Sequence, residues 1–253
     1  MLYPLLKHCI TKGCSPCENP EKYEKAELDY VRLCLDKRFG AQHDHLRARR
    51  IPTIVDIGAH VGLWSLHLAE HCTQSLGVVP CILAIEPDPA NFAALEYNKK
   101  PVESGVYGIN GACWDHTEEL WLHHGLHAGG YYTKPGVSGK GVSVVAYPLD
   151  KMMINNFMPM PVDVMKLDVE GAELNTLVGA QGTISQSPNM LLCVEYSIGN
   201  YRRFNATPAQ VTEFLTNRGF VIPRKQDRAA LKAIKPAQIL RIFFAKGEGI
   251  VYV

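Results

Sequence analysis

Three ionisable residues recur at alternate positions in the apolar stretch Val162–Gly171. Alternate residues of a β-strand point to the same face, so Lys166, Asp168 and Glu170 would gather on one face of a buried strand. Burying a charge without a partner costs several kcal/mol, so these groups should pair with one another or with a ligand. The next apolar run also ends in a carboxylate, Glu195. These four residues are the first candidates for a catalytic centre.

A glycine turn between an apolar strand and a helix is the second candidate site. The stretch Val55–Gly62 follows the β-branched run Ile51–Ile54 and precedes Leu63–Ala69, whose apolar spacing is helical. Gly58 and Gly62 allow a sharp turn and a close backbone approach. Because a helix start offers free backbone N–H groups, the pattern predicts that the polar end of a ligand lies against this turn.

The second apolar run, Cys81–Ile85, ends at Glu86 and Pro87. A carboxylate at the tip of the second strand can accept hydrogen bonds from both hydroxyls of a ribose. We therefore predict that Glu86 holds the ribose of a nucleoside-containing ligand.

Strand and helix patterns alternate around these sites. A helix over residues 21–39 is predicted to bury Tyr23, Ala26, Tyr30 and Leu33. Further helices are expected over residues 89–100 and from Thr207, a typical N-cap before Pro208, to residue 217. Strands are predicted at residues 106–113, 119–124, 142–148, 190–195, 219–222 and 239–244.

Composition narrows the class of protein. The chain has 253 residues, of which 47% are hydrophobic and 20% charged, with a net charge of +1. This suits one large α/β domain or one domain with an extension, and gives no electrostatic reason to expect a nucleic acid or an anionic membrane as partner. The longest apolar run, Leu76–Ile85, is too short to span a bilayer. The segment Met1–Lys7 does not resemble a signal peptide, so we expect a cytoplasmic protein.

Eight scattered cysteines suggest reduced thiols rather than a disulfide framework. Near the N-terminus, His8, Cys9, Cys14 and Cys17 are of the types that bind zinc, but a Cys-x2-Cys pair without a second matching pair is incomplete. We expect a leader without a metal there, and leave zinc as the alternative.

Two stretches together carry a resemblance. Val55–Gly62 followed by Ile85-Glu86-Pro87 looks like the cofactor-binding half of an S-adenosylmethionine-dependent methyltransferase. Leu149-Asp150 with the string Asp163–Glu173, which reads Lys-x-Asp-x-Glu-Gly-Ala-Glu from Lys166, is similar to the signature of the FkbM-type methyltransferase family. The resemblance covers residues 51 to 195, and the family usually has Asn where this chain has His60.

The resemblance implies a doubly wound α/β fold with a seven-stranded, mostly parallel sheet and a C-terminal antiparallel hairpin. Residues 119–148 would be an insertion, residues 1–50 an irregular leader and a helix, and residues 51–253 the methyltransferase domain. The cofactor would be S-adenosylmethionine. The implied cofactor-binding residues are Asp56, Gly58, Ala59, His60, Gly62, Ser65, Glu86, Pro87, Ala112, Cys113 and Asp168.

The family typically methylates a hydroxyl of a sugar, lipid or natural product, so the expected acceptor is a small molecule or glycan. A hydroxyl is a poor nucleophile and needs a general base or a metal. Asp168 is the first candidate for either role, Lys166 would hold the acceptor oxygen or neutralise Asp168, and a divalent metal stays open. Glu170 and Glu195 are further candidates, and His60 is an alternative base with a near-neutral pKa.

Three other functions remain open from the sequence. An RNA ribose methyltransferase would need a basic track, for which only Arg47–Arg50 and Arg224–Arg228 qualify. A non-catalytic scaffold would not need to retain the ionisable strand end. A dinucleotide oxidoreductase is disfavoured because the Gly58-x-x-x-Gly62 spacing lacks the first glycine pair of the usual fingerprint.

Overall fold

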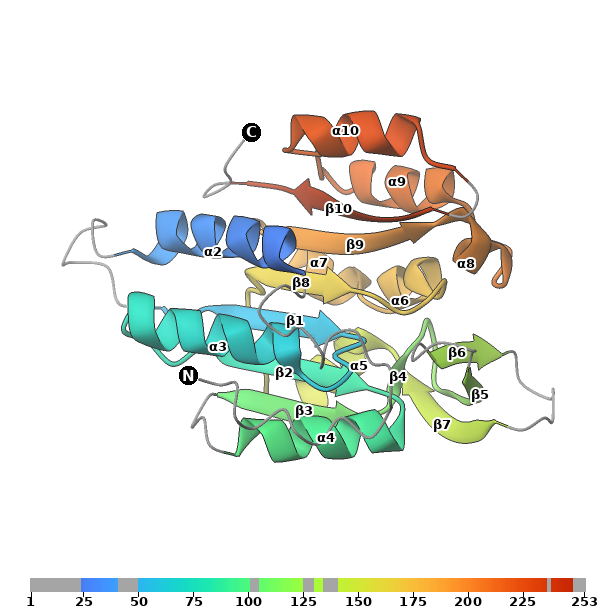
Figure 1. Cartoon of the computed structure of the whole chain (residues 1–253), viewed down its shortest axis with the longest axis horizontal. Helices are drawn as coiled ribbons and strands as arrows, with labels where there is room; N and C mark the ends of the chain where they lie inside the picture. The colour runs from blue at the N-terminus through green and yellow to red at the C-terminus, as the bar shows by residue number, and fades with distance from the viewer. Residues whose placement is uncertain are drawn as a thin grey trace.

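The computed structural model describes residues 24–40, 50–100, 105–124, 130–133, 141–235 and 238–247. A six-stranded sheet forms its centre (Figure 1). The strands lie in the order β10 (Ile239–Ala245), β9 (Leu191–Ser197), β8 (Val164–Leu167), β1 (Thr53–Ile57), β2 (Cys81–Glu86) and β3 (Val106–Asn110). All neighbouring pairs are parallel except β9 and β10, which are antiparallel. The predicted α/β class with a C-terminal antiparallel hairpin is confirmed.

The strand order reverses between β1 and β8. From β1 the chain adds β2 and β3 on one side, and it then returns to add β8, β9 and β10 on the other. In open parallel sheets, ligands bind at the carboxyl ends of the strands beside such a reversal. The register pairs Asp56 of β1 with Lys166 of β8. Two candidate residues are therefore neighbours at this point.

Helices cover both faces of the sheet (Figure 1). One core cluster joins the sheet to α2 (Lys25–Phe39), α3 (Leu63–Ser75) and α4 (Pro89–Lys99). The other joins it to α5 (Leu149–Asn155), α6 (Glu173–Val178), α7 (Gln181–Ser185) and α9 (Pro208–Thr216). The remaining helices are α8 (Ile198–Arg202) and α10 (Lys225–Lys232), and α10 contacts β10.

The predicted insertion forms a second sheet. Its strands lie in the order β4 (Ala112–Cys113), β7 (Val142–Tyr147), β5 (Glu118–His124) and β6 (Gly130–Thr133). Figure 1 shows this sheet beyond the arrowheads of β2 and β3, at the same end as the candidate site.

Two predictions of detail are wrong. The described residues form six strands in the main sheet rather than seven, because residues 219–222 contribute only a bridge from Val221 to Ala245. That segment lies between the turn at Gly219 and Pro223, which has no N–H to extend the pairing. In α2, Leu33 is exposed, and Leu28, Val31 and Leu35 are buried beside Tyr30 and Cys34.

Other local predictions are confirmed. Thr207 caps α9, with its side chain accepting from the backbone N–H of Gln210, and Pro208 is the first helical residue. None of the described cysteines forms a disulfide: Cys34, Cys72, Cys81, Cys113 and Cys193. The N-terminal cluster of His8, Cys9, Cys14 and Cys17 lies outside the described residues. Within the described part of the chain, no helix has the length and apolar character needed to cross a membrane.

Candidate functional site

Two cations, the buried Lys166 and the partly buried Arg241, connect the candidate residues. Lys166 Nζ lies 3.1 Å from Asp168 Oδ2 and 3.8 Å from Asp56 Oδ1. Arg241 donates from Nη2 to Asp168 Oδ2 and from Nη1 to Glu195 Oε2, both at 2.9 Å. Three neighbouring strands, β1, β8 and β9, and the antiparallel strand β10 thus bring their charged side chains to one place. Lys166 and Asp168, which were expected to pair with one another or with a ligand, do pair, and Glu195 joins them through Arg241.

Glu170 joins the cluster by a turn instead of by strand alternation. Strand β8 ends at Leu167, and Glu170 has a left-handed backbone with φ of 54°. Its Oε2 accepts from Asn200 Nδ2 at 2.7 Å, and the same nitrogen donates to Glu195 Oε1 at 2.9 Å. One carboxylate oxygen each from Asp168, Glu170 and Glu195 lie within 4.8 Å of one another.

The neighbouring cations and burial shift the pKa values of Asp168 and Glu195 in opposite directions. Burial alone would raise the pKa of Asp168, but Lys166 and Arg241 outweigh it and hold that pKa well below its usual range. Burial raises the pKa of Glu195 far above its usual range, and the charge of Asp168 raises it further. Lys166 and Arg241 therefore favour the ionised form of Asp168, whereas burial and the charge of Asp168 favour the protonated form of Glu195.

Asp56 is held from the neighbouring helix. Its side chain is completely buried, and Oδ2 accepts from the hydroxyl of Ser65 at 2.7 Å. Oδ1 has no hydrogen-bond donor. Burial raises the pKa of Asp56, although Lys166 and Ser65 act in the opposite direction. The Ser65 hydroxyl, which belongs to the implied cofactor-binding residues, thus orients Asp56.

The glycine turn contacts the ionisable strand end directly. Gly58 has φ of 83°, and a Cβ built on it would overlap the backbone carbonyl oxygen of Asp168. Gly62, with φ of 85°, forms the N-cap of α3. Both glycines occupy the left-handed region, which a residue with a Cβ enters only at a cost. The two sequence-predicted sites are therefore one site.

Glu86 closes the other side of the turn. Its Oε2 accepts from the backbone N–H of His60 at 2.8 Å, and its Oε1 accepts from that of Asp88 at 3.0 Å. Burial raises the pKa of Glu86 to about 7 despite these hydrogen bonds. The carboxylate is thus fixed at the carboxyl end of β2, where the ribose was predicted.

His60 stands at the tip of the turn with φ of 53°. Burial lowers its pKa, and Lys166 lowers it further against the opposing charges of Asp168 and Asp88. The imidazole is therefore neutral at pH 7 and able to accept a proton.

Three other predicted residues lie around this centre. Pro87 follows Glu86, and its carbonyl accepts from Asn110 Nδ2 at 3.1 Å. Ala112 and Cys113 on β4 come next to β2, but both are completely buried in the core. Burial also raises the pKa of the Cys113 thiol.

Sequence reasoning missed Arg241, Glu24 and Asn200. The register of β10 places Arg241 opposite Glu195, but antiparallel pairing across 46 residues cannot be read from either strand alone. Glu24 precedes α2, and its carboxylate lies 3.5 Å from Arg241 and 3.9 Å from Lys166. One signal was available, because Arg241 interrupts the apolar run Ile239–Phe244.

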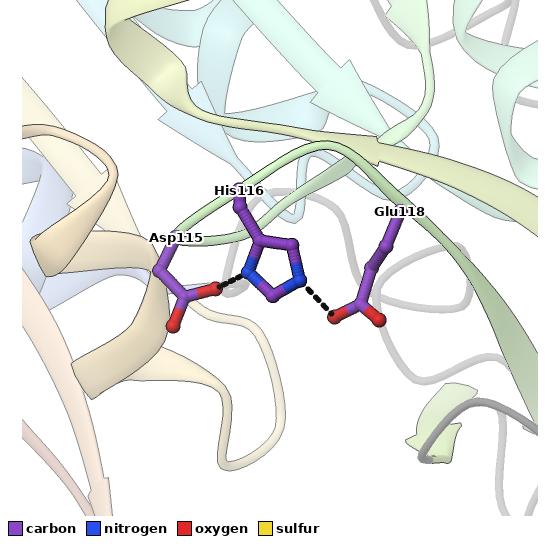
Figure 2. Close-up of side chains that lie close together, drawn as sticks. All are labelled: Asp115, His116 and Glu118. Carbon is purple, nitrogen blue, oxygen red and sulfur yellow. Dashed lines mark hydrogen bonds and ion pairs between the residues drawn. The ribbon is translucent and has the colours of Figure 1, made fainter.

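A second cluster lies in the turn between β4 and β5 (Figure 2). His116 Nδ1 is 2.5 Å from Asp115 Oδ1, and Nε2 is 3.4 Å from Glu118 Oε1. Both ring nitrogens face a carboxylate, and the His116 side chain is 64% exposed. The cluster thus has the arrangement of a surface ion-pair group, separate from the buried site.

Comparison with known proteins identifies the family of the chain. The sequence model of the Methyltransferase FkbM domain matches residues 56–222. No curated protein matches the chain in sequence.

Solved structures give similar folds at low identity. A methyltransferase FkbM from Methylobacillus flagellatus KT has a TM-score of 0.49 and 15% identity, over 96% of this chain and 58% of that one. WbdD has a TM-score of 0.53 and 11% identity, over 97% of this chain and 47% of that one. Magnesium protoporphyrin IX methyltransferase from Synechocystis PCC 6803 was solved with bound S-adenosylmethionine. It has a TM-score of 0.47 and 10% identity, over 94% of this chain and 86% of that one.

The chain thus spans little more than half the length of the first of these structures. The family match, in contrast, covers most of this chain, from the strand that carries Asp56 to the segment after α9. The chain therefore belongs to the FkbM methyltransferase domain family and carries an S-adenosylmethionine-dependent methyltransferase domain.

Proposed function

We propose that the protein is an O-methyltransferase that moves the methyl group of S-adenosylmethionine to a hydroxyl of a sugar, lipid or natural product. One observation carries the proposal: the glycine turn after β1 packs directly on the backbone of Asp168. A cofactor lying on that turn would be beside ionisable groups that can handle an incoming hydroxyl.

The residues around the turn fit the cofactor. Gly58 leaves room that a Cβ would fill, and Asp56 Oδ1 is a buried acceptor without a donor. Asp56 and the turn would hold the methionyl part, whose ammonium group supplies donors. Glu86 would accept from the ribose hydroxyls, because its Oε2 has a second lone pair beyond the backbone N–H of His60, and its Oε1 accepts from Asp88 and only at 3.5 Å from Asn91. The backbone of Ala112 and Cys113 would border the adenine.

The cofactor supplies an activated methyl group, so the protein mainly has to align two reactants and remove one proton. Asp168, kept ionised by Lys166 and Arg241, would accept a hydrogen bond from the acceptor hydroxyl and orient it. A carboxylate with so low a pKa is a weak base. We therefore assign proton removal to the neutral imidazole of His60, with Glu170 and Glu195 as the alternatives.

A methyl-transfer assay tests this assignment. Labelled S-adenosylmethionine is incubated with a panel of hydroxyl-bearing glycans, lipids and natural products, with wild-type protein and Asp168→Asn. We expect transfer by the wild type and a loss of about 100-fold in the variant, because Asp168 orients the acceptor hydroxyl and a misplaced reactant costs a rate factor on that scale. Asp29→Asn, which removes a surface carboxylate paired with Lys25, is the matched control and should retain activity. Full activity in Asp168→Asn would contradict the assignment.

The same assay distinguishes a mechanism that uses side chains alone from one that needs a divalent metal. Asp168, Glu170 and Glu195 present carboxylate oxygens close together, although Arg241 and Asn200 already bind both oxygens of Glu195. A mechanism by these side chains alone predicts activity that survives EDTA. Activity lost in EDTA and restored by Mg²⁺ would assign the carboxylates to a metal instead.

RNA is not the proposed acceptor. The arginines of the predicted basic segments that the structure describes are used internally: Arg50 pairs with Asp163, Arg224 pairs with Asp227, and Arg228 donates to the carbonyl of Ile222. They therefore do not form an open track for phosphates.

A further inference from the structure

Glu24 holds an unusual position at the start of α2. It is the N-cap residue, yet its side chain makes no capping hydrogen bond, and its backbone is left-handed with φ of 43°. A cap bond normally stabilises a helix, and a left-handed backbone in a non-glycine residue is destabilising. Despite the missing cap bond and the left-handed backbone, the Glu24 carboxylate lies inside the charged cluster.

The Glu24 carboxylate has unused hydrogen-bonding capacity there. Its side chain is 9% exposed, and neither oxygen has a hydrogen-bond donor. The nearest cationic nitrogens belong to Arg241, at 3.5 Å, and Lys166, at 3.9 Å. Both lie closer to Asp168, at 2.9 and 3.1 Å. A buried carboxylate in this state is costly unless a ligand supplies donors.

The charge balance of the cluster indicates which ligand would do so. Ion pairs connect two cations, Lys166 and Arg241, to four carboxylates, namely Glu24, Asp56, Asp168 and Glu195. Anionic groups therefore outnumber cationic groups by two when all are ionised, and still by one when Glu195 is protonated. A buried excess of one sign calls for protons or a cationic ligand.

We propose that Glu24 is a cofactor-binding residue whose carboxylate contacts the positively charged methionyl end of S-adenosylmethionine. The inference rests on the proposed function. That end carries a sulfonium and an ammonium group, and the ammonium supplies the N–H donors that the carboxylate lacks. Glu24 and its partner Arg241 both lie outside the family match at residues 56–222, so the flanking segments of this chain complete the site.

Calorimetric binding of three ligands tests the inference without reference to turnover. S-adenosylmethionine has both cations, S-adenosylhomocysteine lacks the sulfonium, and 5′-methylthioadenosine lacks the amino-acid part. We expect Glu24→Gln to weaken the binding of S-adenosylmethionine by about tenfold or more. The affinity for 5′-methylthioadenosine should stay within about twofold of the wild-type value. An equal loss for S-adenosylhomocysteine assigns the contact to the ammonium, and an unchanged affinity assigns it to the sulfonium.

Two controls separate binding from folding. Asp29→Asn removes an exposed carboxylate of the same helix and should change none of the three affinities. If Glu24→Gln lowers the thermal midpoint, Glu24→Asp is measured as well; it keeps the charge, and we expect it to recover part of the preference for S-adenosylmethionine over 5′-methylthioadenosine.

The failures are distinguishable. Wild-type protein that binds none of the three ligands would overturn the proposed function together with this inference. Wild-type protein that binds S-adenosylmethionine, with Glu24→Gln either matching it or losing all three ligands equally, would overturn the inference alone. In that case Glu24 only neutralises Lys166 and Arg241 and holds α2 to the sheet.

Discussion

Arg241 and Lys166 set the ionisation of the site. Both cations approach Asp168 Oδ2, and Arg241 reaches Glu195 with its other terminal nitrogen. The two cations favour the ionised form of Asp168, whereas burial and the charge of Asp168 favour the protonated form of Glu195. Two carboxylates within one cluster can thus take different roles at one pH.

Glu86 gives the sharpest prediction at a single residue. Removing its carboxylate in Glu86→Ala should weaken the binding free energy of S-adenosylmethionine by about 1.5–3 kcal/mol, because hydrogen bonds from the ribose hydroxyls to a carboxylate are charge-assisted. Isothermal titration calorimetry measures this change. Glu96→Ala, on the exposed side of α4 where Glu96 pairs with Lys99, is the control and should bind as the wild type does. Equal affinities for all three proteins would remove Glu86 from the ribose site.

The turn between β1 and α3 is the element on which the site depends. Gly58 and Gly219 share the same φ of 83°, but a Cβ at Gly58 meets the carbonyl of Asp168, whereas nothing lies within 4 Å at Gly219. Substitutions at these two glycines therefore distinguish the cost of a left-handed backbone from the cost of a clash with the Asp168 carbonyl.

We expect Gly219→Ala to cost about 1 kcal/mol of unfolding free energy, the price of left-handed backbone alone. Gly58→Ala should cost at least about 1–3 kcal/mol more, since either β1 or β8 must move, and should weaken cofactor binding. Urea unfolding measures both variants. Similar losses at the two positions would show that the turn and the end of β8 are not in tight contact.

Sequence reasoning predicted elements whose signal is local. The strand–turn–helix at Val55–Gly62, the acidic end of β2 and the cap at Thr207 each depend on residues within a few positions, and each is found. The buried face of α2 was predicted wrongly because apolar residues surround much of that helix, so Leu28, Val31 and Leu35 competed with the chosen stripe. Packing against the sheet decides between such stripes.

The candidate site was predictable where adjacent parallel strands meet. Lys166, Asp168 and Glu195 lie at strand ends that the fold must bring together. Arg241 and Glu24 were not predictable in this way, because they arrive from an antiparallel edge strand and from the start of a helix on one face. Long-range register and the entry angle of a helix are tertiary properties that local patterns do not contain.

At the scale of the whole molecule, buried carboxylates make stability depend on pH. Burial raises the pKa of Glu86 to about 7 and that of Glu173 to about 8. Their unfolded values are about 4.3, so the stability they contribute is complete below that pH and is lost as the pH rises through 7 and 8. Two lowered pKa values act in the opposite direction: that of Asp168 only in acid below about pH 4, and that of His60 below about pH 6.5, where one histidine offsets part of the effect of the two glutamates.

The ligand-free protein should therefore have a higher thermal midpoint at pH 5.5 than at pH 8.5, by several degrees. Scanning fluorimetry across this range measures the slope. Glu173→Gln, which cannot ionise at a completely buried position, should flatten the slope. A midpoint that rises with pH in the wild type would contradict the assigned ionisation states.

A crystal structure with S-adenosylhomocysteine tests the central claim most directly. The account predicts that the methionyl part lies on the Gly58–Gly62 turn, that the ribose hydroxyls contact Glu86, and that the sulfur faces the side on which Asp168 lies. A ligand bound at any other edge of the sheet, with Lys166 and Asp168 remote from its sulfur, would contradict it.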